Sequence, residues 1–154
     1  MKHSVAVLLV LLLARFSVSP DAFAQQTDST ATPPIGMQEE ASGVQLEPNY
    51  PNPFDRETRI PFLLGEDLFE DGRQVVVTVR IFNVLRQPVA TPTAVDHPSA
   101  AGRLVQELPY DLPGRYELYW DGRDQTGELV PSGIYFCQIV ASRSTDVRKM
   151  IVTR

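Results

Sequence analysis

Apolar and polar residues alternate along much of the chain after position 44, and this alternation predicts β-strands. The clearest case is Gln74–Phe82, where one face would carry Val75, Val77, Val79 and Ile81. Successive side chains of a strand point to opposite faces, so such a run has one side suited to a core. Strand-like runs also occupy Thr58–Leu64, Arg103–Leu108, Arg115–Trp120, Gly133–Ser142 and Val147–Arg154.

Residues rich in Gly, Pro and Asp separate these runs, and the strands recur at a spacing of roughly 8–12 residues. That spacing is typical of an all-β, antiparallel β-sandwich. Asn83–Arg86 is predicted as a tight turn, Pro92–Gly102 as a longer loop, and Glu66–Asp71 as a single helical turn. No segment has a convincing helical period.

The first 24 residues have the pattern of a secretory signal peptide. Positive charge precedes the apolar run Val5–Ala14, and Ala22–Ala24 supplies a small-x-small cleavage site. The alternative is that this run stays in place as a membrane anchor. Residues 25–45 are polar, lack an apolar period and predict a disordered linker, with order beginning near Val44. The folded domain is then expected over residues 46–154.

Charge and cysteine content narrow the function further. Removing residues 1–24 changes the formal net charge from −5 to −6. No basic cluster is present to contact phosphates, so a nucleic-acid partner is not expected. Cys137 is the single cysteine, so no internal disulfide is expected, and a buried, small apolar role is predicted for it.

The loop Trp120–Phe136 raises the question of metal binding. An EF-hand loop that starts at Asp121 fails at its third, sixth and twelfth positions. A looser oxygen-ligand site formed by Asp121, Asp124 and Glu128 is the alternative. The glycines and aspartates of this segment favour a simple turn. We therefore expect no metal and no cofactor.

Catalytic chemistry has weak support. Once the signal peptide is removed, His97 is the only histidine, and Asp96 and Ser99 lie beside it in one Pro-containing loop. A Ser-His-Asp triad is assembled in space and needs an oxyanion hole, so solvated polar residues are the favoured interpretation. No small-molecule substrate is expected.

The stretch Asn49–Phe54 contains two prolines that restrict the chain. We predict a rigid lead-in to the first long strand, with Tyr50 and Phe54 anchored on the core. The alternative is a Pro-rich ligand for an aromatic groove.

Four segments, taken in order, carry a family resemblance: "NYPNPFDRETRIPF", "VRIFNVLRQPVA", "GRYELYWDGRDQTGELVPSGIYF" and "RKMIVTR". Together they resemble the type A C-terminal sorting domain of the type IX secretion system, a family related to the immunoglobulin-like domain of the flagellar hook-capping protein. The resemblance runs from Leu46 to the last residue. Its signature positions are Trp120, Asp121, Gly122, Asp124, Gly127 and Ser132.

The resemblance implies an immunoglobulin-like sandwich of seven to eight strands without catalytic activity. It implies export to the periplasm, recognition there by the outer-membrane type IX translocon and its processing machinery, and then secretion or surface display without a stable transmembrane anchor. The positions that match sorting motifs are Pro51, Asn52, Pro53, Gly133, Tyr135, Lys149 and Arg154. Departures from the family occur at Asp55–Arg56, at Arg86, where the family has Gly, and at Cys137–Gln138.

Two other functions stay open at the level of sequence. One is a stand-alone adhesion or scaffold module of the cell envelope. The other is a calcium-dependent carbohydrate-binding sandwich, which would depend on the three acids of the Trp120–Phe136 loop.

Overall fold

Residues 42–154 are the part of the chain that the computed structural model describes. The predicted signal peptide and nearly all of the predicted linker lie outside these residues. The described chain forms nine strands and one short 3-10 helix. In order these are β1 (Val44–Leu46), β2 (Thr58–Leu64), η1 (Glu66–Leu68), β3 (Val75–Asn83), β4 (Pro88–Ala90), β5 (Thr93–Ala94), β6 (Leu108–Tyr110), β7 (Gly114–Trp120), β8 (Gly133–Ala141) and β9 (Ser144–Val152).

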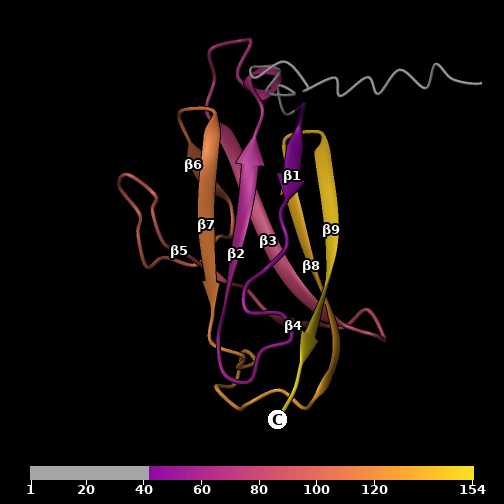
Figure 1. The fold of residues 1–154 in the computed structure, drawn as a ribbon. Helices are drawn as coiled ribbons and strands as arrows, with labels where there is room; N and C mark the ends of the chain where they lie inside the picture. Colours follow the sequence, from indigo (N-terminus) through magenta and orange to yellow (C-terminus); the bar gives the residue numbers. More distant parts are fainter. Residues whose placement is uncertain (1–41) are drawn as a thin grey trace, which may run out of the picture. The chain divides into compact units, whose positions relative to one another are not determined.

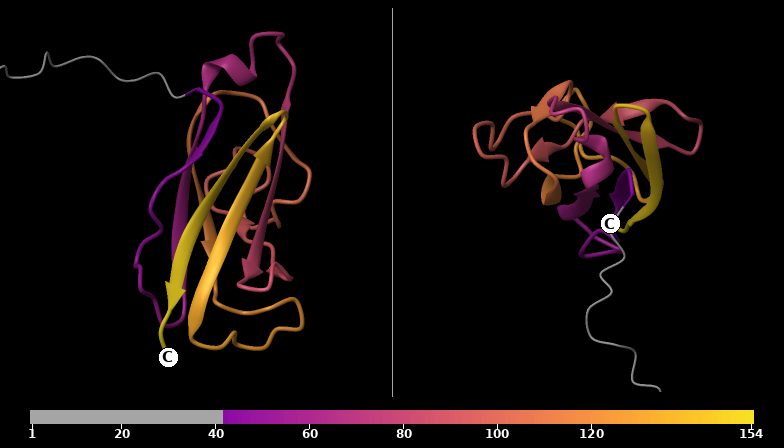
Figure 2. Two further views of the ribbon diagram at one scale, coloured as in Figure 1. Left: turned by 90° about the vertical axis from the view of Figure 1, so that its right-hand side faces the viewer. Right: turned by 90° about the horizontal axis from the view of Figure 1, so that it is seen from above.

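The strands form two antiparallel sheets, and the predicted all-β sandwich is confirmed (Figure 1). Sheet A has the order β1-β2-β7-β5, and sheet B has the order β4-β3-β8-β9, with β6 also paired to β3. Figure 2 shows the long strands of sheet B lying side by side. Residues 42–154 contain no helix with the length and apolar character that a membrane span needs.

The alternation that predicted the strands also decides which side chains are buried. Val77, Val79 and Ile81 of β3 are fully buried, and Cys137 and Ile139 of β8 face them across the register. Burial raises the pKa of the Cys137 thiol to about 12, because the charged thiolate would lose its hydration. The predicted apolar role of Cys137 is confirmed.

The sandwich is closed along one side by side chains instead of a strand ladder. The amide of Val44 donates a hydrogen bond to Ser144 Oγ at 2.9 Å, and the amide of Leu46 donates one to Asp146 Oδ2 at 2.7 Å. Both donors lie on the outer edge of β1, and both acceptors lie on β9. Strand β1 begins at Val44, where order was expected to begin, so residues 44 and 45 belong to the sheet and the expected domain start at residue 46 is two residues late.

The strand expected at Arg103–Leu108 is absent, and that prediction is wrong. The segment passes from one sheet to the other: the amide of Ala94 in β5 binds the carbonyl of Arg103, and the amide of Val79 in β3 binds the carbonyl of Val105. A segment that contacts each sheet in turn cannot build a continuous ladder with either. The strand in this region is β6, which starts only at Leu108.

Candidate functional site

The last residues of the chain pair with the proline-containing lead-in to β2. The amide of Phe54 donates to the carbonyl of Ile151 at 3.0 Å, and the amide of Thr153 donates to the carbonyl of Phe54 at 2.8 Å. Asn52 Oδ1 accepts a further hydrogen bond from the Ile151 amide at 3.0 Å. The segment around Pro53 therefore extends sheet B beyond the edge of β9, and it does so in parallel orientation.

The lead-in is held from its other end by a buried polar pair. Asn49 Nδ2 donates to Thr58 Oγ1 at 2.9 Å, and Thr58 Oγ1 donates to the carbonyl of Pro51 at 2.9 Å. The peptide bonds before Pro51 and Pro53 are both cis. These hydrogen bonds tie the turn to the start of β2 and hold the lead-in in one conformation.

Phe54 is buried as predicted, but the prediction for Tyr50 is wrong. Tyr50 forms an isolated bridge with Arg59 and points to solvent, where its hydroxyl binds Glu117. The inward position before the prolines belongs to Asn49, which is 3% exposed. Neighbouring side chains of the extended lead-in point in opposite directions, so only one of Asn49 and Tyr50 can face the interior.

Arg154 folds back into the loop between β7 and β8. Its Nε donates to the carbonyl of Val130 at 2.7 Å, and its guanidinium donates to the carbonyl of Gly122 at 3.0 Å. Its backbone amide donates to Ser132 Oγ at 2.9 Å. Asp55 lies 3.8 Å from the same guanidinium. The side chain of Arg154 is only 20% exposed and packs against the loop, although the residue as a whole is exposed.

Gly122 allows this close approach. Its φ is +66°, and a Cβ atom there would lie 2.7 Å from the carbonyl oxygen of Arg56 and 2.8 Å from the Arg154 guanidinium. Only glycine meets both the backbone conformation and the lack of space. Gly127 in the same loop has φ +86° but open space around it.

The acids of the loop accept hydrogen bonds from its own backbone. Asp124 Oδ1 accepts from the Thr126 amide at 2.8 Å, from the Thr126 hydroxyl at 2.6 Å and from the Glu128 amide at 3.1 Å. The hydroxyl bond leads the effects that lower the pKa of Asp124. Asp121 Oδ1 accepts from the Arg123 amide at 3.1 Å. The loop is thus a set of turns closed by its own carboxylates.

The candidate calcium ligands therefore do not converge. Among residues 42–154 no group of three His, Cys, Asp or Glu side chains is placed to hold a metal ion. Asp121 and Asp124 each serve a separate turn of the loop, and Glu128 is exposed.

Three aromatic rings fill the space beneath this end of the sandwich. The ring centroids of Phe54 and Trp120 are 5.4 Å apart, and those of Trp120 and Tyr135 are 5.7 Å apart, both in edge-to-face geometry. Trp120 Nε1 donates to the carbonyl of Arg123, and the Tyr135 hydroxyl donates to that of Pro131. Trp120 and Tyr135 are both buried and belong to the core.

The motif residues are far apart in sequence, and most of them meet at this one end of the fold. We call this group the terminal cluster; it comprises Pro51–Phe54, Trp120–Gly122, Val130–Ser132, Tyr135 and Thr153–Arg154. Lys149 stands apart from it: it is exposed on β9, opposite Phe136 in the register. Gly133 begins β8 and makes no close contact, with Tyr135 3.9 Å from its missing Cβ.

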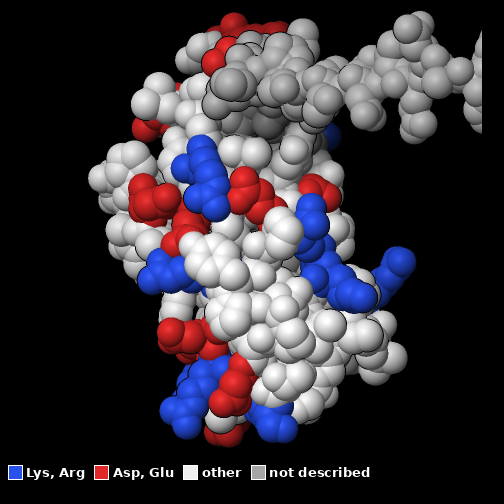
Figure 3. Space-filling view, viewed as in Figure 1, with Lys and Arg blue, Asp and Glu red and all other residues white. Residues whose placement is uncertain are grey.

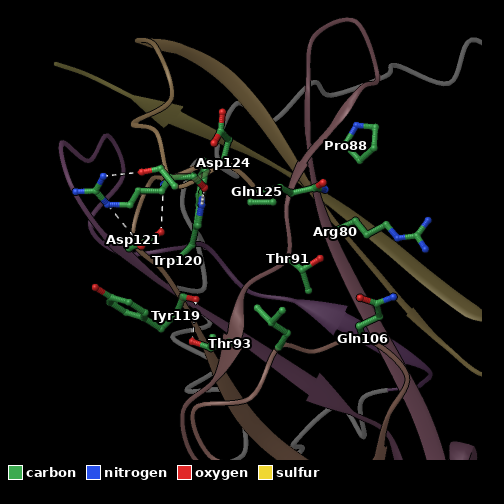
Figure 4. A pocket seen from close by; sticks show the side chains of 14 residues that line it. Arg80, Pro88, Thr91, Thr93, Gln106, Tyr119, Trp120, Asp121, Asp124 and Gln125 are labelled. Atoms are coloured by element: carbon green, nitrogen blue, oxygen red, sulfur yellow. Dashed lines mark hydrogen bonds and ion pairs between the residues drawn. The ribbon is translucent and has the colours of Figure 1, made fainter.

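A hollow of about 710 Å³ with a mixed polar and apolar lining lies beside the terminal cluster (Figure 4). Trp120, Asp121 and Asp124 stand on one side of it, and Thr91 and Gln106 stand on the other. The hydrogen bonds described above already engage both aspartates.

His97 is buried, so the prediction of a solvated histidine is wrong. The Ser99 amide donates to His97 Nδ1 at 3.2 Å, which leaves the proton on Nε2 to donate to the carbonyl of Pro109 at 2.8 Å. Asp96 accepts a hydrogen bond from the Glu117 amide instead of binding the imidazole. Both ring nitrogens of His97 are thus hydrogen-bonded to backbone atoms. No nucleophile–base pair forms among Asp96, His97 and Ser99.

Sequence reasoning missed two contributions to the terminal cluster. It gave no structural role to Thr58, which links the lead-in to β2, and it did not place Arg154 against Gly122. The signal for the first was a β-branched hydroxyl residue at the start of a strand beside a proline turn. The second pair is 32 residues apart, and no local pattern connects them.

No protein-family model and no curated protein matches the chain. Among solved structures, the crystal structure of dimeric latent PorU from Porphyromonas gingivalis aligns with 73% of this chain at 18% identity and a TM-score of 0.45. The chain spans 10% of that protein. The sandwich itself is established by the strand pairing of this chain.

Proposed function

We propose that this protein is a non-catalytic sorting domain, exported to the periplasm and carried across the outer membrane by the type IX translocon. The observation that carries the proposal is the terminal cluster. Residues that match the family motifs at the lead-in, at the loop after β7 and at the chain terminus form one hydrogen-bonded surface. A translocon could read that surface as a single feature.

The geometry explains how such a recognition surface would keep a single conformation. The lead-in prolines, the loop and the terminal arginine are all held by backbone hydrogen bonds and by the buried rings of Phe54, Trp120 and Tyr135. A recognition surface that is already ordered loses little conformational entropy on binding. In this proposal the translocon and its processing machinery are the partners, and the product is secreted or displayed on the cell surface.

The test compares delivery of the full chain in a host that has the translocon with delivery in the same host lacking an essential translocon component. We expect the protein at the surface or in the medium only in the first host, and in the periplasm in the second. Equal delivery in both hosts would refute the proposal. Deleting Val147–Arg154 is a poorer test, because the deletion removes Met150 and Val152 from the core.

A stand-alone envelope adhesion or scaffold module is the second candidate, favoured by the exposed apolar side chains of sheet B. The intact mass of the exported protein separates the two. A full-length domain in a stable complex supports the module, whereas loss of the domain from surface material supports the address.

A further inference from the structure

The two outer faces of the sandwich differ in chemistry. On sheet A, Glu117 binds both Arg59 and Tyr50, Arg115 binds Glu47 at 2.8 Å, and Tyr119 binds Glu57. Figure 3 looks onto this side and shows basic and acidic side chains intermixed. The charges of sheet A are thus matched within the protein.

The outer face of sheet B is apolar and cationic. We call it the sheet B face; it comprises Val76, Thr78, Arg80, Phe82, Ile134, Phe136, Gln138, Val140, Thr145, Val147, Lys149 and Ile151. These outward positions of β3, β8 and β9 include no Asp or Glu. Glu107 borders the face, because its amide binds Thr78 Oγ1.

The register shows how apolar and basic residues are arranged on it. Phe82, Phe136 and Lys149 lie in one row across the three strands, and Val147 follows in the next row beside Gln138. Val147 is 52% exposed. An apolar sheet face that is open to water is unusual in a stable monomer and commonly marks an interaction site.

A depression lies on the sheet B face beside the turn between β3 and β4. It has a volume of about 560 Å³ and is lined by Phe82, Val84, Arg86, Phe136 and Val147, among others. The neighbouring turn residue Leu85 is 74% exposed. An apolar side chain inserted here would meet aromatic rings, with the charged group of Arg86 beside it.

Arg86 also has a backbone conformation that is unfavourable for any residue other than glycine. Its φ is 60°, in the left-handed region, and its amide donates to the carbonyl of Asn83. A non-glycine residue in that region loses roughly 1 kcal/mol or more. Strained residues often mark functional sites, and Arg86 lies at the edge of the depression.

We propose that the sheet B face docks a protein partner that presents an apolar side chain flanked by carboxylates. The apolar group would enter the depression beside Phe82 and Phe136, and its carboxylates would pair with Arg86 and Lys149. Complementary charge of this kind guides association and sets register. The inference does not rest on the sorting role, and it stands or falls separately from it.

The charges of the sheet B face favour a protein partner over a second copy of the chain and over an anionic bilayer. A face-to-face pairing of two copies would bring Arg86 and Lys149 of each copy toward a surface without carboxylates. An anionic bilayer attracts clusters of basic residues, but here the two cations of the face and Arg86 beside it belong to a chain of net charge −5. A protein partner can place carboxylates locally and avoid both conflicts.

The test uses the full chain with a photo-crosslinking amino acid at Val147, on the sheet B face, or at Gln45, on the outer side of sheet A. In exporting cells we expect a protein adduct from position 147 and none from position 45. The crosslinked peptide should carry Asp or Glu next to apolar residues. Lys149→Glu and Arg86→Glu should each reduce adduct yield about fivefold or more.

Two controls separate loss of docking from loss of fold. Arg73→Glu removes an exposed cation outside the face and should leave the yield unchanged. Changing the partner's mapped carboxylate to Lys should restore the adduct with Lys149→Glu. An adduct of two copies, equal yield from position 45, or insensitivity to Lys149→Glu would overturn the proposal. So would binding to vesicles of phosphatidylglycerol and phosphatidylcholine without any protein adduct.

Discussion

The side chain of Arg154 donates a hydrogen bond from Nε to the carbonyl oxygen of Val130 at 2.7 Å, which ties the last residue to the loop after β7. A second bond reaches the carbonyl of Gly122 at 3.0 Å. These two bonds make the side chain of Arg154 a structural member of the terminal cluster. Removing this side chain should therefore lower the stability of the fold and, in the proposed function, weaken recognition by the translocon.

We predict that Arg154→Ala lowers the free energy of unfolding by about 1–3 kcal/mol, because two carbonyl oxygens lose a charged donor. The free energy of unfolding of Arg154→Lys should lie between those of Arg154→Ala and the unsubstituted protein, since a single amine cannot bond both carbonyl oxygens as the guanidinium does. Urea unfolding followed by Trp120 fluorescence measures the change. Arg73→Ala is the matched control, with its side chain 83% exposed, and a loss as large as that of Arg154→Ala would contradict the assignment.

Gly122→Ala should destabilise the fold more than Gly127→Ala. Both positions have positive φ, so each substitution carries a conformational penalty of about 1–2 kcal/mol. At Gly122 the new methyl group would also meet the Arg56 carbonyl oxygen at 2.7 Å, whereas at Gly127 it would meet nothing within 4 Å. Thermal unfolding of the pair isolates the steric part. Equal melting temperatures would show that the loop relaxes around the added methyl group.

Arg86→Gly should raise the free energy of unfolding by about 1 kcal/mol, because glycine adopts the left-handed conformation without strain. Val84→Gly in the same turn is the comparison, and it should not stabilise, since glycine there only adds freedom to the unfolded chain. Denaturant midpoints measure both changes. A lower midpoint for Arg86→Gly would mean that the arginine makes a contact worth more than its strain.

Stability should fall at alkaline pH. Burial raises the pKa of Tyr110 above its ordinary value, as it does for Tyr116 and Tyr135. A raised pKa means that the folded state favours the neutral phenol, so the stabilisation is complete below about pH 10 and is lost as the pH rises further. Urea unfolding at a series of pH values from neutral to alkaline tests this. Tyr110→Phe removes one ionising group and should make the alkaline loss smaller; an unchanged loss would exclude Tyr110 as a contributor.

Much of the strand pattern could be predicted from sequence because it depends on local alternation. β2 occupies Thr58–Leu64 as expected, and the buried face of β3 is the one that the valines define. The tight turn at Asn83–Arg86 and the helical turn at Glu66 were local as well. Each of these features needs only a few neighbouring residues to specify it.

The errors occurred where a residue's environment depends on distant parts of the chain. His97 lies in a polar-looking loop, yet Tyr110 packs against its ring with centroids 4.5 Å apart. Arg103–Leu108 has an apolar pattern, yet it crosses from one sheet to the other. Composition alone cannot reveal which loop another element covers or which segment bridges two layers.

The sequence by itself determined an all-β chain, the faces of its long strands and the turns between them, because side-chain alternation and turn chemistry act over a few residues. Only the tertiary structure decided that Pro51–Phe54, Gly122 and Arg154 share one surface, and that the acids of the loop serve its turns. It also decided that no other element of residues 42–154 covers the sheet B face. These features depend on strand order and on contacts between residues up to about a hundred positions apart, which no local pattern encodes.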